Sequence, residues 1–273
     1  MKNLFSVIML VYIFVISSVQ ANDFPGREKF PEISIYSKEQ LKKNYDKVII
    51  VDARSKLEFE TLRVKNAINI PVASNDFTQR VAALRKKSKD PIVFYCNGHT
   101  CFKSYIAAKK ANKANIANVF AYDEGLFSWA RTYPNESVLL GQSPIDTKHI
   151  ISKTAFKQRL LNPTEFSDLA FKSGSKKIIV DVRDRYQRGA SGFFPGKEKW
   201  VSMDEKEKMT KLFKKAVDEK KTLFIYDETG KQVRWLQYAL EQNNVTNYFF
   251  MKKGAKAFYQ EMMEDFGIKK TAL

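Results

Sequence analysis

Short uninterrupted apolar runs recur along the chain and alternate with segments that have helical periodicity. The runs lie at 48–51, 92–95 and 119–122 in the first half and at 178–180, 223–226 and 248–251 in the second. A strand buried on both faces of a sheet has a continuous apolar run rather than an alternating one. The segments 104–114 and 233–242, each placed between two such runs, are compatible with helices. The pattern predicts an α/β fold in which parallel strands are joined by crossover helices.

The two halves of the chain carry the same landmarks in the same order. An apolar run ends in Asp-x-Arg, a second run ends at a polar or nucleophilic residue, and a Gly follows with an aromatic residue four positions later. These landmarks are Asp52, Arg54, Cys96, Gly125 and Trp129 in the first half and Asp181, Arg183, Asp227, Gly254 and Phe258 in the second. We interpret this as a tandem duplication. It predicts two domains, at 33–140 and 150–268, separated by a segment at 133–144 that carries turn formers and no clear periodicity.

The first 21 residues have the pattern of a secretory signal peptide. Lys2 precedes an apolar run at 4–16, and the small residues Val19 and Ala21 occupy the −3 and −1 positions of a cleavage site after Ala21. An uncleaved anchor is the alternative, but a run this short falls below the roughly 20 residues that a membrane-spanning helix needs. No later segment is long and apolar enough to span a membrane. We therefore expect a periplasmic or secreted protein.

Composition and charge exclude several classes of protein. The hydrophobic share of 44% and the charged share of 28% are those of a folded globular chain. The formal net charge of +17 comes from lysines scattered through the sequence, so we expect a solvated basic surface and no nucleic-acid partner. Only two histidines, His99 and His149, rule out a His-rich metal site, and two cysteines alone do not build a structural zinc site. We expect no metal and no cofactor.

Cys96 stands where the loops of a parallel sheet carry chemistry. It directly follows an apolar run and precedes a predicted helix, and ligands of open α/β sheets bind at the carboxyl ends of the strands. Inward-facing backbone N–H groups, the positive end of a helix dipole and the ammonium of Lys103 would each favour a thiolate there. Asp52 and Arg54 are more simply explained as residues that hold the loop after their strand, and Trp129 and Phe258 as core anchors.

At this point the motifs resemble those of the rhodanese family. The likeness runs over about 33–134 and rests on Asp52-x-Arg54, Glu58-Phe59, the Ala-Ile-Asn-Ile-Pro segment at 67–71, the Tyr-Cys loop ending in Lys103-Ser104, and Gly125 with Trp129. The second half, over about 150–262, resembles the same domain more loosely. The resemblance implies two tandem rhodanese-like domains, each a mostly parallel sheet flanked by helices.

The resemblance also implies a function, that of a thiosulfate sulfurtransferase-like enzyme. Cys96 would be the nucleophile that takes a sulfane sulfur from an anionic donor such as thiosulfate, holds it as a persulfide and passes it to a thiol or cyanide-like acceptor. The loop that would cradle the substrate consists of Asn97, Gly98, His99, Thr100, Cys101, Phe102 and Lys103.

Two departures from the family pattern affect these expectations. The family loop has six residues from Cys to Arg, whereas this loop has eight from Cys96 to Lys103, with Lys at the last position. Loop length helps to set the substrate, since related phosphatases have a longer loop, so hydrolysis of an oxyanion ester stays open. In the second half Asp227 occupies the Cys position, so that domain is expected to be inactive.

Cys101 opens an alternative from another functional class. Two cysteines of an exported protein tend to pair, and Cys101 could act as a resolving thiol that attacks an oxidised or persulfidated Cys96. The chain would then be a periplasmic thiol-redox or sulfur-binding protein that uses a Cys96–Cys101 pair. A buried core cysteine and a purely structural disulfide are further interpretations, although so short a ring constrains the unfolded chain little.

Overall fold

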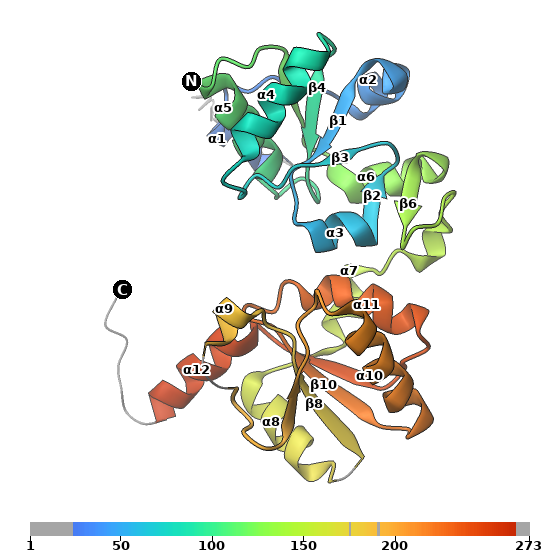
Figure 1. The fold of residues 1–273 in the computed structure, drawn as a ribbon, viewed down its shortest axis with the longest axis vertical. Coiled ribbons are helices and arrows are strands. Elements are labelled where there is room, and N and C mark those ends of the chain that lie inside the picture. The colour runs from blue at the N-terminus through green and yellow to red at the C-terminus, as the bar shows by residue number, and fades with distance from the viewer. Residues whose placement is uncertain (1–23, 175, 190–191, 266–273) are drawn as a thin grey trace, which may run out of the picture.

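A computed structural model of the protein describes residues 24–174, 176–189 and 192–265. These residues form two α/β lobes, each built around its own sheet, with the first lobe uppermost in Figure 1. The predicted signal peptide at 1–21 and the last predicted residues of the second domain, 266–268, lie outside the described residues. Among the helices that the structure describes, none has both the length and the apolar character needed to cross a membrane.

The sheet of the first lobe has four parallel strands in the order β3-β1-β4-β5. Its strands are β1 (Ile49–Asp52), β3 (Ile68–Asn69), β4 (Ile92–Tyr95) and β5 (Val119–Tyr122). The helices of this lobe are α1 (Pro25–Lys29), α2 (Lys38–Lys43), α3 (Lys56–Thr61), α4 (Phe77–Lys87), α5 (Lys103–Lys113) and α6 (Gly125–Thr132). The central strands β1 and β4 are the apolar runs of the sequence, and both are buried on both faces.

Helices cover the two faces of this sheet, and alternate residues of each strand point to opposite faces. On β4, Phe94 packs with helices α4 and α5, whereas Val93 and Tyr95 pack with α2 and α6. Trp129 on α6 is fully buried in the second of these cores, so its predicted role as a core anchor is confirmed.

The second lobe has a five-stranded sheet in the order β7-β11-β10-β8-β9, again parallel throughout. Its strands are β7 (Leu160–Leu161), β8 (Lys177–Asp181), β9 (Glu198–Trp200), β10 (Thr222–Tyr226) and β11 (Tyr248–Met251). Its helices are α7 (Lys153–Lys157), α8 (Pro163–Lys172), α9 (Arg185–Arg188), α10 (Lys206–Asp218), α11 (Val233–Gln242) and α12 (Gly254–Asp265). Helices α10 and α11 cover one face, and α8 and α12 cover the other.

The strand order of the two sheets agrees over four strands. β3, β1, β4 and β5 of the first sheet correspond to β9, β8, β10 and β11 of the second when each is counted from the Asp-x-Arg strand. A single bridge between Ile35 and Ala121 stands where the second sheet has β7. The predicted fold class, an α/β chain with mostly parallel sheets flanked by helices, is confirmed.

The segment between the halves departs from the prediction. Residues 133–144 were expected to lack regular structure, but Ser137–Leu139 forms the strand β6, which pairs antiparallel with β2 (Leu62–Val64). A three-residue strand is too short to give a period in the sequence, and it is held here by a partner more than seventy positions earlier. Short 3₁₀ turns lie on either side of β6, at Pro134–Glu136 before it and at Thr147–His149 after it. The domain limits 33–140 and 150–268 stay predictions.

The two lobes share an apolar core. Trp235 and Tyr238 on α11 belong to the same buried cluster as Trp129 of the first lobe. The ring of Trp235 stacks on Phe127 of α6 at 5.8 Å, and the Tyr238 hydroxyl accepts a hydrogen bond from the backbone N–H of Ile151. Packing of this kind fixes one lobe against the other, because aromatic side chains bury large areas.

Candidate functional site

Cys96 is the first residue after β4, at the carboxyl edge of the first sheet. Its side chain is buried with the rest of the strand. The loop at 97–102 then leads into α5, which begins at Lys103. Ser104, in the first turn of this helix, is buried, with its hydroxyl 3.8 Å from the Cys96 sulfur. The location is the one predicted from the sequence.

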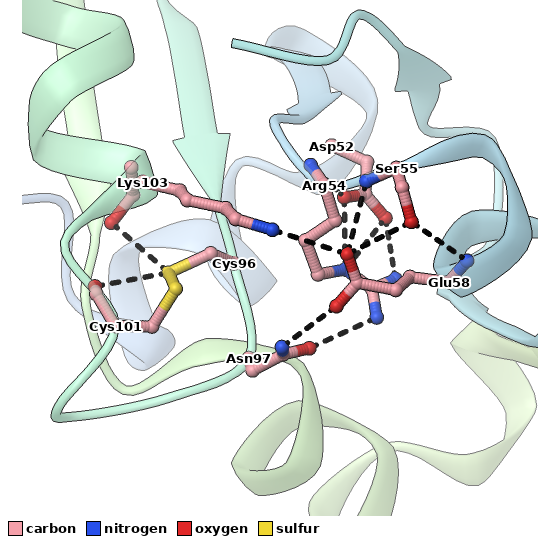
Figure 2. The surroundings of a disulfide bond; sticks show 9 residues. Asp52, Arg54, Ser55, Glu58, Cys96, Asn97, Cys101 and Lys103 are labelled. Atoms are coloured by element: carbon pink, nitrogen blue, oxygen red, sulfur yellow. Dashed lines mark hydrogen bonds and ion pairs between the residues drawn. A yellow bond between two sulfur atoms is a disulfide. The ribbon is translucent and has the colours of Figure 1, made fainter. Parts of the chain in front are cut away.

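A disulfide joins Cys96 to Cys101 across the loop (Figure 2). Their Cα atoms are 6.3 Å apart, a separation that a disulfide spans without backbone movement. The Cys96 sulfur also lies 3.0 Å from the carbonyl oxygen of Cys101. The structure therefore describes the oxidised loop. The thiolate, which is the nucleophilic form of cysteine, arises only after this bond is reduced.

Glu58 on α3 holds both ends of the loop, as Figure 2 shows. Asn97, the first loop residue, donates its side-chain amide to Glu58 Oε1 at 2.9 Å. Lys103, the last, brings its ammonium to 3.2 Å from Glu58 Oε2. Glu58 is itself fixed by a capping box with Ser55, which sets the start of α3. The charge of Lys103 is thus engaged by a carboxylate beside the loop.

A buried ion pair between Arg54 and Asp52 also contacts the Cys96 loop. Arg54 and Asp52 are both fully buried, and Arg54 Nη2 lies 2.6 Å from Asp52 Oδ2. Arg54 Nη1 donates to the side-chain oxygen of Asn97 at 3.1 Å, and Nη2 donates to the backbone oxygen of Leu62. The Arg54 backbone N–H also donates to Asp52 Oδ1, so the pair holds the loop after its own strand, as expected, and the contact with Asn97 adds support for the Cys96 loop. The same Asp-Arg geometry recurs between Asp181 and Arg183 in the second lobe.

The charges of this network shift the pKa values of its members. Burial works against the charge of Arg54, but Asp52 more than offsets it and raises the pKa of that guanidinium. Burial also favours the neutral form of Glu58. Arg54, Lys103 and the hydrogen bond from Asn97 outweigh that effect, so the pKa of Glu58 lies below its ordinary value. Glu58 is therefore a carboxylate at neutral pH.

The remaining predicted loop residues meet the N-terminal helix α1, which the sequence patterns did not predict. His99 is exposed, and its ring lies 4.4 Å from that of Phe24. Phe102 lies 5.9 Å from Phe30 and beneath the ammonium of Lys29. Thr100, between them, is exposed. Residues 24–30 therefore lie against the outer side of the loop.

The Cys96 loop packs closely against the start of α6, and a glycine in α6 makes this possible. Gly125, at the start of α6, has φ +74, and a Cβ there would collide with the backbone of Asn97 and Gly98. Gly98 is half-buried at this contact. The Gly125 predicted as a landmark of the repeat is thus a close-approach position. Gly254 does the same in the second lobe, against the backbone of Asp227 and Gly230.

The loop after β10 in the second lobe surrounds a carboxylate of its own chain. Asp227 occupies the position equivalent to Cys96, and it accepts backbone hydrogen bonds from four residues. The donors are the N–H groups of Thr229, Gly230, Gln232 and Val233. Burial raises the pKa of Asp227, and these donors act in the opposite direction. A cradle of N–H groups that suits an anion is formed here, and the Asp227 side chain fills it.

A cavity of about 580 Å³ lies between the two lobes. From the first lobe it is lined by Ser55, Glu58, Asn97 and Lys103, and from the second by residues of the Asp227 loop and of α11. The cavity therefore borders both ends of the Cys96 loop, at Asn97 and at Lys103. Its volume is in the usual range for small-molecule sites. Sequence patterns did not reveal this site, because it needs both lobes.

Comparison with known proteins gives a family for part of the chain. Residues 37–132 match the model of the Rhodanese-like domain. The chain matches no curated protein sequence. Among solved structures it is similar to the thiosulfate sulfurtransferase from Pseudomonas aeruginosa, at 15% identity and a TM-score of 0.40, over 84% of this chain. The match covers only 43% of the Pseudomonas chain.

Smaller proteins of related description match single lobes. A rhodanese-related protein from Thermoplasma volcanium is 18% identical, with a TM-score of 0.29, over 37% of this chain and 93% of its own. A rhodanese from E. coli, solved with anions, is 22% identical, with a TM-score of 0.28, over 34% of this chain and 98% of its own. The matched segment 37–132 spans β1, the Cys96 loop and α6. Residues 37–132 of this chain are therefore similar to the Rhodanese-like domain.

Proposed function

We propose that this protein is a sulfurtransferase that carries sulfane sulfur on Cys96. The observation that supports this most directly is the position of Cys96. It is the first residue after the central strand β4, it begins the loop that leads into α5, and it lies within the segment that matches the Rhodanese-like domain. Reduction of the disulfide would leave the thiol beside the Ser104 hydroxyl, and the N-terminus of α5 would favour the thiolate.

The proposed reaction has two displacement steps. In the first, the Cys96 thiolate attacks the sulfane sulfur of thiosulfate, an S–S bond forms, and sulfite leaves with the electron pair of the broken S–S bond. In the second, the thiolate of an acceptor attacks the outer sulfur of the Cys96 persulfide and releases the Cys96 thiolate. No net oxidation accompanies the cycle, and the acceptor leaves as a persulfide.

Cys101 gives the persulfide a second possible fate. Its thiolate can attack the inner sulfur, which is Cys96 Sγ, expel hydrosulfide and form the Cys96–Cys101 disulfide. A thiol reductant then has to reopen the loop by exchange before another cycle. The disulfide in the structure supports this, because it places the two sulfur atoms in bonding contact.

The mass of the intact protein tests the proposal. The chain is reduced, freed of reductant, incubated with thiosulfate and weighed. We expect a gain of one sulfur atom in the wild type and in Cys101→Ser, and no gain in Cys96→Ser. Cys101→Ser should hold its sulfur longer, since the resolving thiol is absent. Unchanged masses in all three proteins, or equal sulfur uptake by Cys96→Ser, would refute the Cys96 persulfide.

The disulfide favours one other candidate, a thiol-redox or sulfur-binding protein that cycles between dithiol and disulfide. In that case the protein as purified is two hydrogens lighter than its reduced form and regains them with a dithiol reductant. It shows negligible sulfur transfer from thiosulfate. A resting protein with both thiols free under oxidising conditions would count against this candidate.

We further propose that the chain is exported and works on a small anionic donor. The leader pattern at 1–21 supports export, and a disulfide persists in an oxidising compartment. The net charge of +17 would attract anions to the surface. The second lobe, whose loop is filled by Asp227, has no thiol at the equivalent position and is proposed to be inactive as a transferase.

A further inference from the structure

We propose that the cavity between the lobes is a binding site for a small oxyanion, with Arg234 of the second lobe as its main anion-binding residue. The chemical class of ligand is a sulfur oxyanion, such as the sulfonate end of a thiosulfate-type donor. In that respect the inference rests on the proposed function, although binding of the anion can be tested without turnover.

Arg234 stands at the start of α11, next to Trp235, and both line the cavity opposite the Cys96 loop. Its guanidinium lies over the ring of Phe127 at 4.8 Å, a cation–π contact. Arg234 Nε is buried and has no hydrogen-bond partner within the part of the chain that the structure describes. Such an unmatched donor is costly to bury. The guanidinium also forms no ion pair within the same described residues, so its Nη donors are left for a ligand in the cavity.

The other charges that line the cavity leave it positive. Glu58 is paired with Lys103 at 3.2 Å, and Glu228 lies 3.6 Å from Arg183. Both carboxylates therefore have a cation beside them, and Glu228 Oε2 has no hydrogen-bond partner within the described residues. The remaining charged residues of the lining are Arg234 and Lys231, and neither makes an ion pair within the described residues. An anion that enters the cavity meets two cations that no carboxylate of the described residues pairs directly.

The pKa values agree with this difference between the arginines of the site. Asp52 raises the pKa of Arg54, whereas burial lowers the pKa of Arg234, and the nearby charge of Glu58 offsets that effect only in part. An arginine keeps its proton even so. The planar guanidinium presents paired N–H donors that match two oxygens of a tetrahedral oxyanion, which is why Arg is common wherever such groups are recognised.

The location explains what the second lobe adds to the first. Lys103, the cation at the end of the Cys96 loop, is engaged by Glu58 and is not free to neutralise a donor. Arg234 supplies that charge from across the cavity. A donor held by its sulfonate at Arg234 would keep its sulfane sulfur directed toward the loop, so the inactive lobe would act as the holder of the substrate.

The test compares Arg234→Gln with Arg131→Gln. The guanidinium of Arg131 also lies over Phe127, at 5.8 Å, but Arg131 is exposed and does not line the cavity. Both substitutions remove one positive charge from the same neighbourhood. Binding of sodium sulfate to each protein is followed by tryptophan fluorescence at constant ionic strength, since Trp235 lines the cavity. The KM for thiosulfate is measured with dithiothreitol, a neutral acceptor.

For Arg234→Gln we expect sulfate to bind at least about tenfold more weakly, because a charge-assisted hydrogen bond is lost. The KM for thiosulfate should rise by a similar factor, while the KM for dithiothreitol stays the same. Arg131→Gln should change the affinity for sulfate and the KM for thiosulfate by no more than about twofold. Arg234→Lys keeps the charge but loses the paired donors, and is expected to lie between the wild type and Arg234→Gln.

Two results would overturn the inference: sulfate binding in Arg234→Gln equal to that of the wild type, or an equal loss in Arg131→Gln. The first means that Arg234 does not hold the anion, and the second that only the general charge matters. Failure of the proposed function looks different. A wild type that binds sulfate through Arg234 but takes no sulfur from thiosulfate would retain the anion site and lose the sulfurtransferase.

Discussion

At the scale of single residues, Glu58 ties the Cys96 loop to the first sheet. It accepts from Asn97 and Lys103 at the two ends of the loop, and Asn97 in turn accepts from the buried Arg54. A buried charge is stabilising only when its partners are all present. The loop geometry around Cys96 therefore depends on a carboxylate that never touches the sulfur.

Replacement of Glu58 by Gln should lower the free energy of unfolding by about 1–3 kcal/mol at pH 7, since charged hydrogen bonds are lost. The pKa of Glu58 is lowered in the folded protein, so its stabilising effect is present above its ordinary value of 4.5 and disappears as the pH falls through the folded-state pKa. Urea unfolding of both proteins between pH 7 and pH 3 checks this.

The difference in the free energy of unfolding between the wild type and Glu58→Gln should become smaller toward pH 3. Glu39→Gln serves as the control, because Glu39 is an exposed glutamate of α2 away from the Cys96 loop. It should change stability little at any pH. A difference between wild type and Glu58→Gln that grows as the pH falls would contradict the stated sign.

Sequence reasoning found Cys96 and its loop and gave Asp52 and Arg54 a holding role, but it did not identify Glu58 as the residue that ties the loop. The Ser55–Glu58 spacing of a capping box is visible in the sequence and could have placed Ser55 at the N-cap of a helix and Glu58 in its first turn. Its contacts with Asn97 and Lys103 join parts of the chain about forty positions apart, and no local pattern encodes them. Arg234 could not have been found, because an arginine in the first turn of a helix does not reveal what it faces.

At the scale of elements, the apolar runs predicted the strands closely. β4, β5 and β11 have the predicted limits, α11 matches 233–242, and α5 begins and ends one residue before the predicted 104–114. These elements are long or strongly apolar, so local sequence determines them. Helix α1 has only five residues, and Phe24 and Phe30, which flank it, pack against residues of the Cys96 loop and of α5. Its stability comes from those contacts, which no short window of sequence contains.

Helix α1 and its flanking residues lie against the Cys96 loop, so displacing α1 tests whether it limits access to the cysteines. Gly26 packs directly against the ring of Tyr105, where a side chain would collide. Gly26→Leu should therefore displace α1 and lower the free energy of unfolding by about 1–3 kcal/mol, the usual cost of overpacking. It should also speed alkylation of the reduced cysteines severalfold, since residues 24–30 no longer lie against His99 and Phe102.

Alkylation by iodoacetamide, followed by mass over time, measures that rate. The matched control is Ala114→Leu, an enlargement at an exposed position just beyond α5. It should leave both stability and alkylation unchanged. Equal alkylation rates in Gly26→Leu and the wild type would mean that α1 does not limit access to the loop.

At the scale of the whole molecule, the two lobes are coupled through α11. Trp235 contacts Phe127 and lies beneath the buried guanidinium of Arg54 at 5.1 Å, so one side chain joins the core, the ion-pair network and the cavity. A surface ion pair between Lys206 and Glu60 also crosses the junction. The ion pair is exposed, and the aromatic contact is expected to supply most of the coupling.

Trp235→Ala should remove about 3–5 kcal/mol of stability and separate the unfolding of the two lobes. We expect calorimetry to show a single transition in the wild type and two in the variant. Trp200→Ala is the control, because Trp200 is 42% exposed on β9, outside the shared aromatic cluster. A single transition retained by Trp235→Ala would show that the lobes are coupled by other contacts.

The carboxylate of Asp227 has a consequence for how the cavity can respond to its surroundings. The loop of the second lobe is built around a side chain of its own, and the sequence of that lobe holds no cysteine. The opposite loop carries the Cys96–Cys101 disulfide, which a thiol reductant would cleave. The cavity thus lies between one wall on which thiol chemistry can act and one on which it cannot, so an oxidant or reductant would reach a molecule bound there from a single side.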